Sequence, residues 1–188
     1  VMTREYWEKE TEEKELPLEH LFTLDEELER EIQEVEGFLA AAPELNFQAR
    51  LGNGVDELPV IGKGIDPEAF GRVFALEDRF VEGSMFAPGE NRAVLGKRLA
   101  DLMDLAVGDY ITLLVKDKDG SYNTIDAEIA GLVHTSNPNV NQNIVYLPLD
   151  IVEQGLNTPG EVSKIIIRLA NKNLASKLKF KSHSHTLS

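Results

Sequence analysis

The sequence predicts an α+β fold built as two lobes, and three observations lead to that prediction. Apolar residues recur at helical spacing after Thr23, while other stretches alternate apolar and polar residues with the period of a half-buried strand. In the second half of the chain the predicted elements come in the order β-α-β-β-β-α-β, which builds a lobe around one sheet. A chain of 188 residues with 42% hydrophobic residues is large enough to bury a core.

The first predicted helix begins at Thr23, which has capping-box spacing with Glu26. Its apolar face predicts an amphipathic helix, and its other face is nearly all glutamate. We expect the helix to run to Pro43 and to end there, because proline breaks a helix. The apolar face consists of Leu24, Leu28, Ile32, Val35 and Leu39.

Two strands follow this helix and complete the first lobe. Residues 45–51 alternate apolar and polar side chains, and Gly52-Asn53-Gly54 turns the chain. Residues 58–65 are predicted to form the returning strand, after which Asp66-Pro67 starts a short helix or a turn. Helix, strand and strand make one lobe.

The second lobe is predicted to begin with a loop that carries several large apolar residues, and it contains a hairpin turn of the Asp-Gly kind. A strongly β-forming run and a helix that leads away follow it. The predicted elements are the loop 74–89, the strand 92–95, the helix 97–105, the strands 110–115 and 121–133, the polar loop 134–143, the strand 144–147, the helix 148–156, the strand 162–169 and the helix 170–180.

Composition excludes several classes of function. The net charge of -14 argues against a nucleic-acid partner, because binding a polyanion needs a basic face. Acidic residues crowd between Glu5 and Glu44, whereas the chain from Lys164 onward carries six basic residues and no acid. This basic end is suited to anionic lipid headgroups, and a solvated terminal helix is the alternative. The absence of cysteine excludes disulfides, thiolate metal sites and a cysteine nucleophile.

The sequence contains no stretch near the roughly 18 to 20 apolar residues that cross a bilayer. No signal peptide opens the chain, which starts with the strand-like Val1-Met2. We therefore expect a fragment whose native flanks have been removed.

Several strings, taken in order, resemble one family. Residues 95–100 (Leu-Gly-Lys-Arg-Leu-Ala) and 105–113 (Leu-Ala-Val-Gly-Asp-Tyr-Ile-Thr-Leu) are similar to the core of the MacB-like periplasmic domain of FtsX-type ABC transporter permeases. Residues 129–133 resemble a strand of that family, and residues 145–149 resemble its strand-to-helix step. The order of these strings carries more weight than any one of them.

The first half resembles the lipoprotein-releasing (LolC/LolE-like) branch of the same family. Pro43, residues 47–54, residues 64–68 (Gly-Ile-Asp-Pro-Glu) and Glu82-Gly83 follow the order found in those permeases. The opening residues 1–6 are similar to the strand and tyrosine that leave the first membrane span. The resemblance covers residues 1 to 169.

This resemblance implies a porter-like βαβ lobe with a small mixed-sheet lobe inserted in it. The implied division is a membrane-proximal arm (1–22), the first part of the porter-like lobe (23–70), the inserted lobe (71–160), a returning strand with a membrane-proximal helix (161–180) and a tail (181–188). The implied location is the extracytoplasmic side of the cytoplasmic membrane.

The implied partners are the protein's own membrane spans, a second permease subunit, a cytoplasmic ABC ATPase, and a lipoprotein or other cargo or carrier. The implied function is to couple ATP hydrolysis to handling of a substrate outside the membrane, with lipoprotein release favoured. Efflux of a peptide, drug or toxin and FtsX-like regulation of a cell-wall hydrolase remain open, because one fold serves all of them.

The chain is predicted to be no enzyme and to hold no cofactor or metal. Residues 62–64 (Gly-Lys-Gly) lack the pattern of a phosphate-binding loop, and no serine lies in a nucleophile elbow. His183 and His185 alternate with serine and suit a transition metal, but a frayed tail is favoured. A hydrolase has no support, and the alternative from another class is a free periplasmic or secreted binding module.

The candidate surface for a partner or substrate has two parts. Phe80, Met85 and Phe86 lie between glycines and would present an apolar patch, although packing between the lobes explains them equally well. His134 and Asn139 lie in the predicted polar loop, whose tip is the other candidate contact with a partner. For His134, a plain loop histidine is the favoured alternative.

Overall fold

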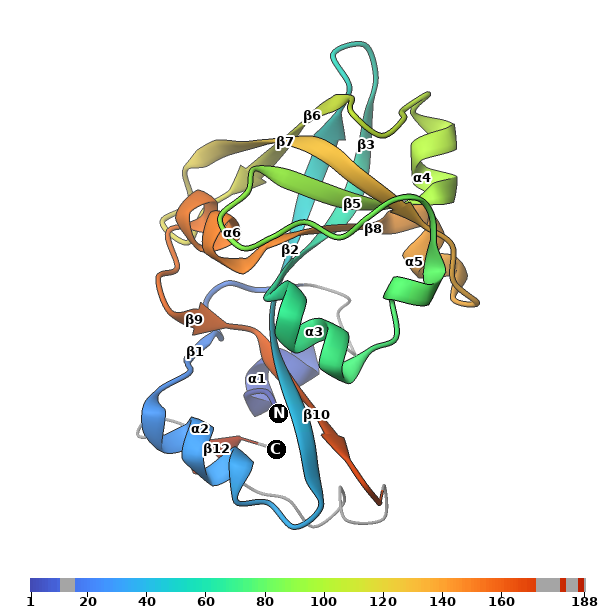
Figure 1. Cartoon of the computed structure of the whole chain (residues 1–188). Coiled ribbons are helices and arrows are strands. Elements are labelled where there is room, and N and C mark those ends of the chain that lie inside the picture. The colour runs from blue at the N-terminus through green and yellow to red at the C-terminus, as the bar shows by residue number, and fades with distance from the viewer. Residues whose placement is uncertain (11–15, 172–179, 182–185, 188) are drawn as a thin grey trace.

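The computed structural model describes residues 1–10, 16–171, 180–181 and 186–187, and it confirms the α+β class (Figure 1). The helices are α1 (Arg4–Glu8), α2 (Glu26–Gln33), α3 (Pro67–Val73), η2 (Glu77–Arg79), α4 (Lys97–Leu102), α5 (Pro138–Asn143) and α6 (Leu149–Leu156). The strands are β1 (Phe22–Thr23), β2 (Phe38–Gly52), β3 (Glu57–Ile65), β4 (Phe80–Gly83), β5 (Arg92–Gly96), β6 (Tyr110–Lys116), β7 (Tyr122–Val133), β8 (Ile144–Pro148), β9 (Glu161–Val162), β10 (Lys164–Leu169), β11 (Phe180–Lys181) and β12 (Thr186–Leu187).

Six strands close into a ring in the upper part of the molecule (Figure 1). β2 pairs with β3, β3 with β8, β8 with β5, β5 with β7, and β7 with β6. The ring closes because β6 also pairs with residues 49–52 of β2. The sheet contains strands that precede residue 70 and strands that follow residue 71. The predicted domain boundary between residues 70 and 71 stays a prediction.

The interior of the ring is apolar. Side chains from all six strands point inward, and residues of α4 and α6 pack against them. Burial of each large aliphatic side chain contributes about 1.5 to 3 kcal/mol to stability. The largest buried side chains of this cluster include Leu45, Phe47, Leu51, Leu95, Leu99, Met103, Ile111, Leu113, Ile129 and Leu132.

One glycine is required by this packing. The ring of Phe47 lies directly over Gly62, and a Cβ atom at Gly62 would clash with the aromatic carbons of Phe47. The two residues are cross-strand partners in β2 and β3. A side chain at Gly62 would therefore displace Phe47 from the interior.

A second apolar cluster covers part of the outer surface of the ring. Residues 66–91, which include α3, η2 and β4, cross the outside of β3, β8, β5 and β7. Phe70 of α3 packs against Tyr146 of β8 with a ring-centroid distance of 5.5 Å. Of the short helix and the turn that the sequence leaves open at Asp66-Pro67, the structure has the helix, and Oδ1 of Asp66 accepts a hydrogen bond from the backbone N–H of Ala69.

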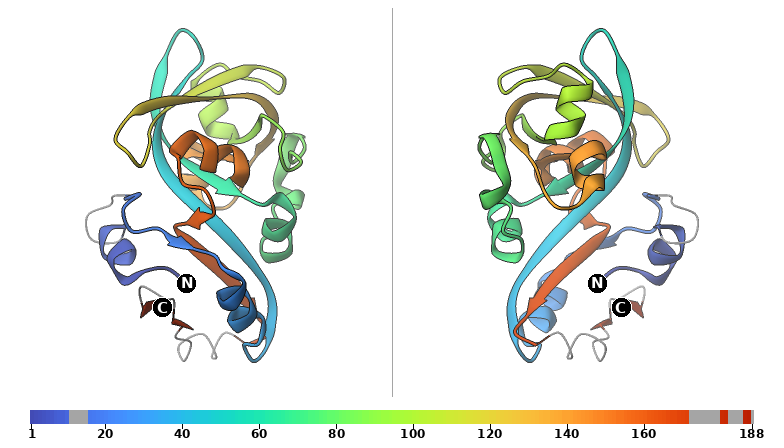
Figure 2. Two further views of the ribbon diagram at one scale, coloured as in Figure 1. Left: turned by 90° about the vertical axis from the view of Figure 1, so that its left-hand side faces the viewer. Right: turned by 90° about the vertical axis from the view of Figure 1, so that its right-hand side faces the viewer.

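The lower part of the molecule contains α1, α2, β1, β9, β10, the first half of β2 and the short strands β11 and β12 (Figure 1 and Figure 2). β10 pairs with β2 along residues 38–44, and α2 packs on this two-stranded ribbon through Leu28 and Ile32. The strand β2 therefore runs through both parts of the molecule. At about 3.3 Å per residue, its 15 residues span up to about 50 Å.

The helix predicted from Thr23 to Pro43 is wrong in its extent. Asp25 caps α2 with its Oδ1, and the helix ends at Gln33. Gly37 adopts a φ of 76°, a left-handed conformation that stops helical continuation, and β2 begins at the next residue.

Pro43 lies inside β2 instead of ending a helix, because its missing N–H is not needed there. The backbone oxygen of Glu44 faces the β10 side, where it accepts a hydrogen bond from the N–H of Ser163. The nitrogen of Pro43 therefore faces the opposite side, and β3 ends at Ile65 opposite Glu44.

Two segments predicted as loops contain regular structure. Residues 74–89 include η2 and β4, and β4 pairs with the end of β7. Residues 134–143 include α5, which starts with Asn137 as its cap and Pro138 in its first turn. Short polar elements of this kind lack an apolar periodicity, so the sequence pattern does not distinguish them from loops.

The predicted helix at residues 170–180 falls mostly outside the described residues. Its last residue, Phe180, belongs to β11, which pairs with β12. His183 and His185 also lie outside the described residues.

Candidate functional site

The part of the molecule where the two ends of the fold meet contains a buried polar cluster, which we call the waist. It lies where the N-terminal arm, β2, β3 and the β9–β10 segment come together. Polar side chains are rarely buried unless they have partners. The waist consists of Tyr6, Glu44, Asn46, Lys63 and Ser163.

Ser163 joins β10 to β2 at the point where their regular pairing stops. Its N–H donates to the backbone oxygen of Glu44 over 2.9 Å, and its Oγ accepts from the backbone N–H of Asn46 over 2.6 Å. Residues 45–48 of β2 lie between the part paired with β10 and the part paired with β6. Ser163 therefore satisfies backbone groups in this gap and fixes β10 against β2.

Glu44 and Lys63 form an ion pair across β2 and β3. The Glu44 carboxylate is 1% exposed, and its Oε2 lies 3.2 Å from Nζ of Lys63, whose side chain is 21% exposed. A buried carboxylate without a partner is strongly destabilising. Lys63 therefore supplies the positive charge that the buried Glu44 carboxylate requires.

Tyr6 inserts into the waist from α1. Thr3 caps this helix by accepting from the N–H of Tyr6 over 3.1 Å, and it donates to the backbone oxygen of His20 over 3.0 Å. Burial raises the pKa of Tyr6, while the neighbouring side chains of Ser163 and Asn46 oppose the rise. The Tyr6 ring thus packs in the core with its neutral hydroxyl at the polar cluster.

The arm is also tied to β10 by backbone hydrogen bonds. Val1 and Ile165 exchange two bonds of 2.6 and 2.7 Å, and Met2 forms a bridge with Lys164. Nζ of Lys164 lies 2.8 Å from a carboxylate oxygen of Glu10. The segment that leads into the fold and the strand that leads out of it are therefore fixed to each other, at the lower part of the molecule (Figure 2).

The waist fixes the arm and β10 against β2 through directional contacts. Among residues 1–10, 16–171, 180–181 and 186–187, no group of three or more His, Asp or Glu side chains is placed to hold a metal ion. Within the same residues, no helix is long and apolar enough to cross a membrane. Hydrogen bonds and the ion pair fix directions, which apolar contacts do not.

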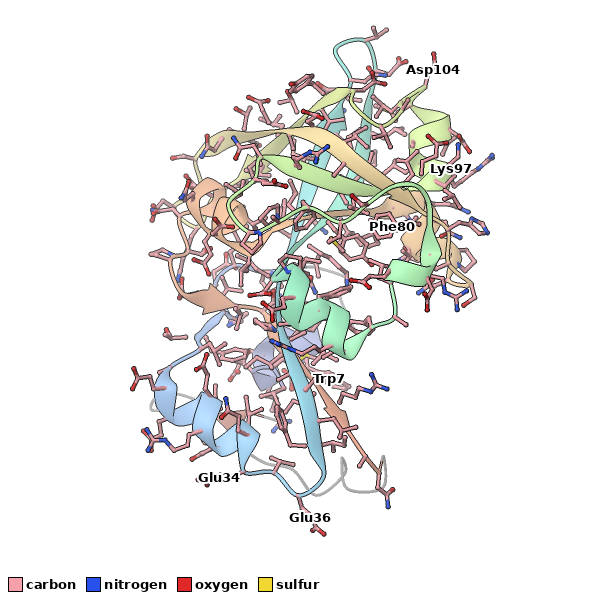
Figure 3. The ribbon with its side chains drawn as sticks, in the orientation of Figure 1. Trp7, Glu34, Glu36, Phe80, Lys97 and Asp104 are labelled. Carbon is pink, nitrogen blue, oxygen red and sulfur yellow. The ribbon has the colours of Figure 1, made fainter. Side chains whose placement is uncertain are left out.

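The predicted apolar patch is partly core. Phe86 is 3% exposed and belongs to the cluster outside the ring, and Phe80 and Met85 are half-buried against the same cluster. Figure 3 shows Phe80 in the upper part of the molecule, whereas Trp7 lies in the lower part. The packing alternative therefore accounts for Phe86, which has no surface to offer a partner.

His134 and Asn139 are both exposed, so a contact with a partner stays a prediction for them. The N–H of His134 donates to the backbone oxygen of Arg79, which ties the start of this segment to the end of η2. Asn139 lies in α5, and its side-chain oxygen accepts from Nδ2 of Asn143 over 2.8 Å.

Sequence reasoning missed the waist. The alternation of residues 45–51 predicts that Asn46 faces water, but Tyr6 and Ser163 cover that face of β2. The sequence signal that was available is the run of Glu44 and Asn46 directly after Pro43, where polar residues flank a fully buried Leu45.

Comparison with solved structures identifies the fold. The fold is similar to that of the extracellular domain of the ABC-type transporter YknZ from Gram-positive bacteria, with a TM-score of 0.62, 13% identity, and coverage of 84% of this chain and 78% of that one. It is also similar to the periplasmic region of MacB from Actinobacillus actinomycetemcomitans, with a TM-score of 0.57, 13% identity, and coverage of 79% and 67%. The fold is thus that of the outer domains of ABC transporters.

The sequence identifies the family. Residues 6–181 match the MacB-like periplasmic core domain family, and this chain belongs to it. It is therefore the periplasmic-type domain of an ABC transporter permease, as the resemblance of its ordered strings implies.

Proposed function

We propose that this domain is the non-enzymatic lever of its permease, and that it couples ATP hydrolysis in a cytoplasmic ATPase to the handling of a substrate outside the membrane. The observation that carries this proposal is the waist, where the arm and β10 are bonded to each other and to β2. A displacement of the arm and β10 reaches the ring through one continuous strand. A stiff, hydrogen-bonded connection of this kind transmits motion without needing chemistry.

The partners we propose are the protein's own membrane spans on either side of the domain, a second permease subunit and an ABC ATPase. Attachment to two spans requires the flanking segments to approach the same face of the domain. The antiparallel bridge between Met2 and Lys164 supports this, because chain running backward from Val1 would lie beside Ile166 and Ile167 of β10.

We propose lipoprotein release as the specific role, with a lipoprotein or its carrier as cargo. Its support is the resemblance of Pro43, residues 47–54 and residues 64–68 to permeases of the lipoprotein-releasing type. Efflux and regulation of a cell-wall hydrolase are the competing roles within the family.

The test is purification of the full-length permease from its native membranes, with mass spectrometry of the proteins that accompany it. We expect an ATPase together with lipoproteins or a periplasmic carrier. An ATPase with an outer-membrane channel or a cell-wall hydrolase would overturn the role in lipoprotein release but would agree with the proposed coupling to ATP hydrolysis. Absence of any ATPase would overturn the proposed function as a whole.

A further inference from the structure

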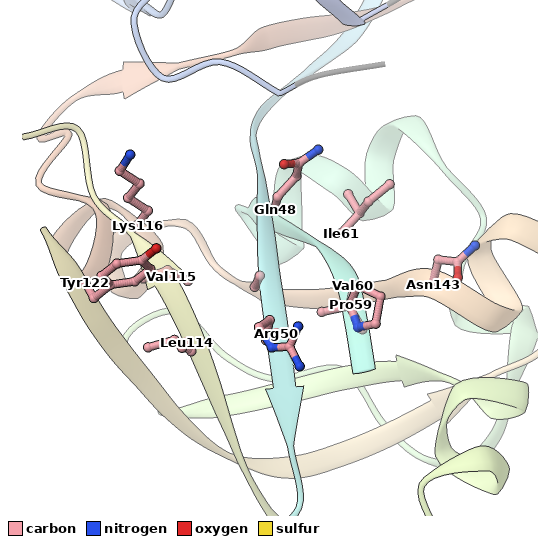
Figure 4. A pocket seen from close by; sticks show the side chains of 11 residues that line it. Gln48, Arg50, Pro59, Val60, Ile61, Leu114, Val115, Lys116, Tyr122 and Asn143 are labelled. Atoms are coloured by element: carbon pink, nitrogen blue, oxygen red, sulfur yellow. The ribbon is translucent and has the colours of Figure 1, made fainter. Parts of the chain in front are cut away.

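A groove of about 470 Å³ opens on the outer face of the ring where β2 and β6 diverge (Figure 4). The two strands pair only between residues 49–52 and 112–115. Beyond that point β2 continues to the waist, whereas Lys116 at the end of β6 pairs with Tyr122 of β7. The groove therefore straddles β2, with Lys116 and Tyr122 on one side and Pro59 and Ile61 on the other.

This groove is uncovered, unlike the neighbouring outer surface of the ring. Residues 66–91 cover the outside of β3, β8, β5 and β7, whereas the lining of the groove comes from β2, β3, β6, Tyr122 and Asn143, with none from residues 66–91. Tyr122 is 76% exposed at its edge, and Ile61 and Leu114 are half-buried in its walls. Apolar side chains that gather in a concave surface favour binding.

The charge of the groove is opposite to that of the protein. Its lining residues include two cationic side chains, Arg50 and Lys116, and no carboxylate, in a chain with 33 acidic and 19 basic residues. Arg50 is paired with Glu57 over 3.0 Å. Lys116 forms no ion pair among the described residues, and it lies at the edge of the groove beside Tyr122.

We propose that this groove binds a short extended peptide segment of a partner protein, one that combines apolar side chains with carboxylates. The apolar walls would bury the aliphatic side chains, and Lys116 at the rim would pair with a carboxylate. The side-chain amides of Gln48 and Asn143 add polar groups that suit a peptide backbone. An acyl chain would leave Lys116 unpaired and its own methylene groups partly in water.

The inference rests on the proposed function only for placing the partner outside the membrane. The binding itself is tested on the 188-residue chain, by fluorescence anisotropy with three labelled ten-residue peptides. One alternates valine and glutamate, one valine and lysine, and one serine and glutamate. We expect the valine-glutamate peptide to bind about tenfold more tightly than either of the others, and to weaken as salt is raised.

Two matched pairs of variants locate the binding. Lys116→Glu should weaken the valine-glutamate peptide about tenfold, whereas Arg98→Glu, the same charge change at an exposed position on α4, should leave it unchanged. Tyr122→Ser should weaken binding severalfold, whereas Tyr110→Ser should not. Tyr110 is equally accessible, at 71%, but lies at the other end of β6.

Equal binding of the three peptides, or binding that Lys116→Glu does not alter, would overturn the proposal. A fluorescent methyl ester of a sixteen-carbon fatty acid has an acyl chain but no carboxylate, and its binding in place of the peptides would also overturn the proposal, in favour of an acyl-chain site. These outcomes are independent of the ATPase pull-down, so failure of the groove and failure of the proposed function are distinguishable.

Discussion

The ring and the waist are adjacent on β2 and are held together by different forces. The interior of the ring is made of aliphatic and aromatic side chains, whose burial is strong but without direction. The waist depends on an ion pair and on hydrogen bonds of the Ser163 hydroxyl and backbone N–H, which are weaker in sum but fix orientation. The ring therefore provides stability, and the waist determines how the ring is held relative to the arm and β10.

This difference predicts that the waist is destabilised by loss of a charged or hydrogen-bonding side chain. The six-stranded ring is destabilised by a change in the volume of a buried side chain. The largest effect is expected at the ion pair. Lys63→Met leaves the buried Glu44 carboxylate alone and should lower the free energy of unfolding by about 3 kcal/mol. Urea denaturation measures this, and the double variant Glu44→Gln with Lys63→Met should recover most of the loss.

The control for that experiment is the exposed pair of Arg50 and Glu57, whose side chains are 56% and 57% exposed. Arg50→Met should change stability by less than about 1 kcal/mol. Similar losses from the two substitutions would show that burial of Glu44 carries no special weight.

The next effect is expected in the ring, at Gly62. Gly62→Ala places a methyl group against Phe47 and should cost about 2 kcal/mol. The cost should shrink in a Phe47→Leu background, because the smaller side chain leaves room. Gly71→Ala in α3 is the matched control, since its Cβ would meet only the side-chain Oε1 of Glu77 at 4.0 Å, and it should be neutral or slightly stabilising. Strict additivity of Gly62→Ala and Phe47→Leu would contradict the packing described here.

A smaller effect depends on pH and is expected in both regions. Burial raises the pKa of both Tyr6 at the waist and Tyr146 outside the ring. The unfolded chain then loses these protons first, so their contribution to stability is complete below about pH 10 and is lost above it. Each tyrosine should reduce the free energy of unfolding by up to about 1.4 kcal/mol per pH unit in that range.

Tyr6→Phe should remove half of this decrease in the free energy of unfolding with rising pH. It should change stability at pH 7 by less than about 1 kcal/mol, because the aromatic side chain stays in place. The measurement is thermal unfolding between pH 7 and 11. An unchanged slope in the variant would show that the Tyr6 hydroxyl is accessible to water.

Local patterns were sufficient for most individual elements. The strands β3, β6, β7 and β8 and the helices α4 and α6 lie close to their predicted positions, because their apolar periodicity or turn residues are distinct. Helix α4 ends at Leu102, three residues before the predicted end, and Asp104 follows with a φ of 52°. The exact end of a helix of this kind depends on the backbone conformation of single residues.

The ring and the waist could not be predicted from local patterns. Closure depends on pairing between residues 49–52 and 112–115, which no periodicity within either strand records. Burial of Glu44 and Asn46 depends on Tyr6 and Ser163, which are far away in the sequence. The groove has the same origin, because it exists only where β2 and β6 separate.

The central claim is that the waist makes the domain move as one body during the ATPase cycle. It is tested most directly by spin labels at Leu39→Cys and Val55→Cys, two exposed sites at the lower end of β2 and at the tip of the β2–β3 hairpin. The chain contains no cysteine, so these labels are unique within the domain. Distances would be measured by pulsed electron paramagnetic resonance in the full-length permease with its ATPase. A single distance that stays the same without nucleotide and with ATP bound is the predicted result, whereas a second distance that appears with ATP would contradict the account.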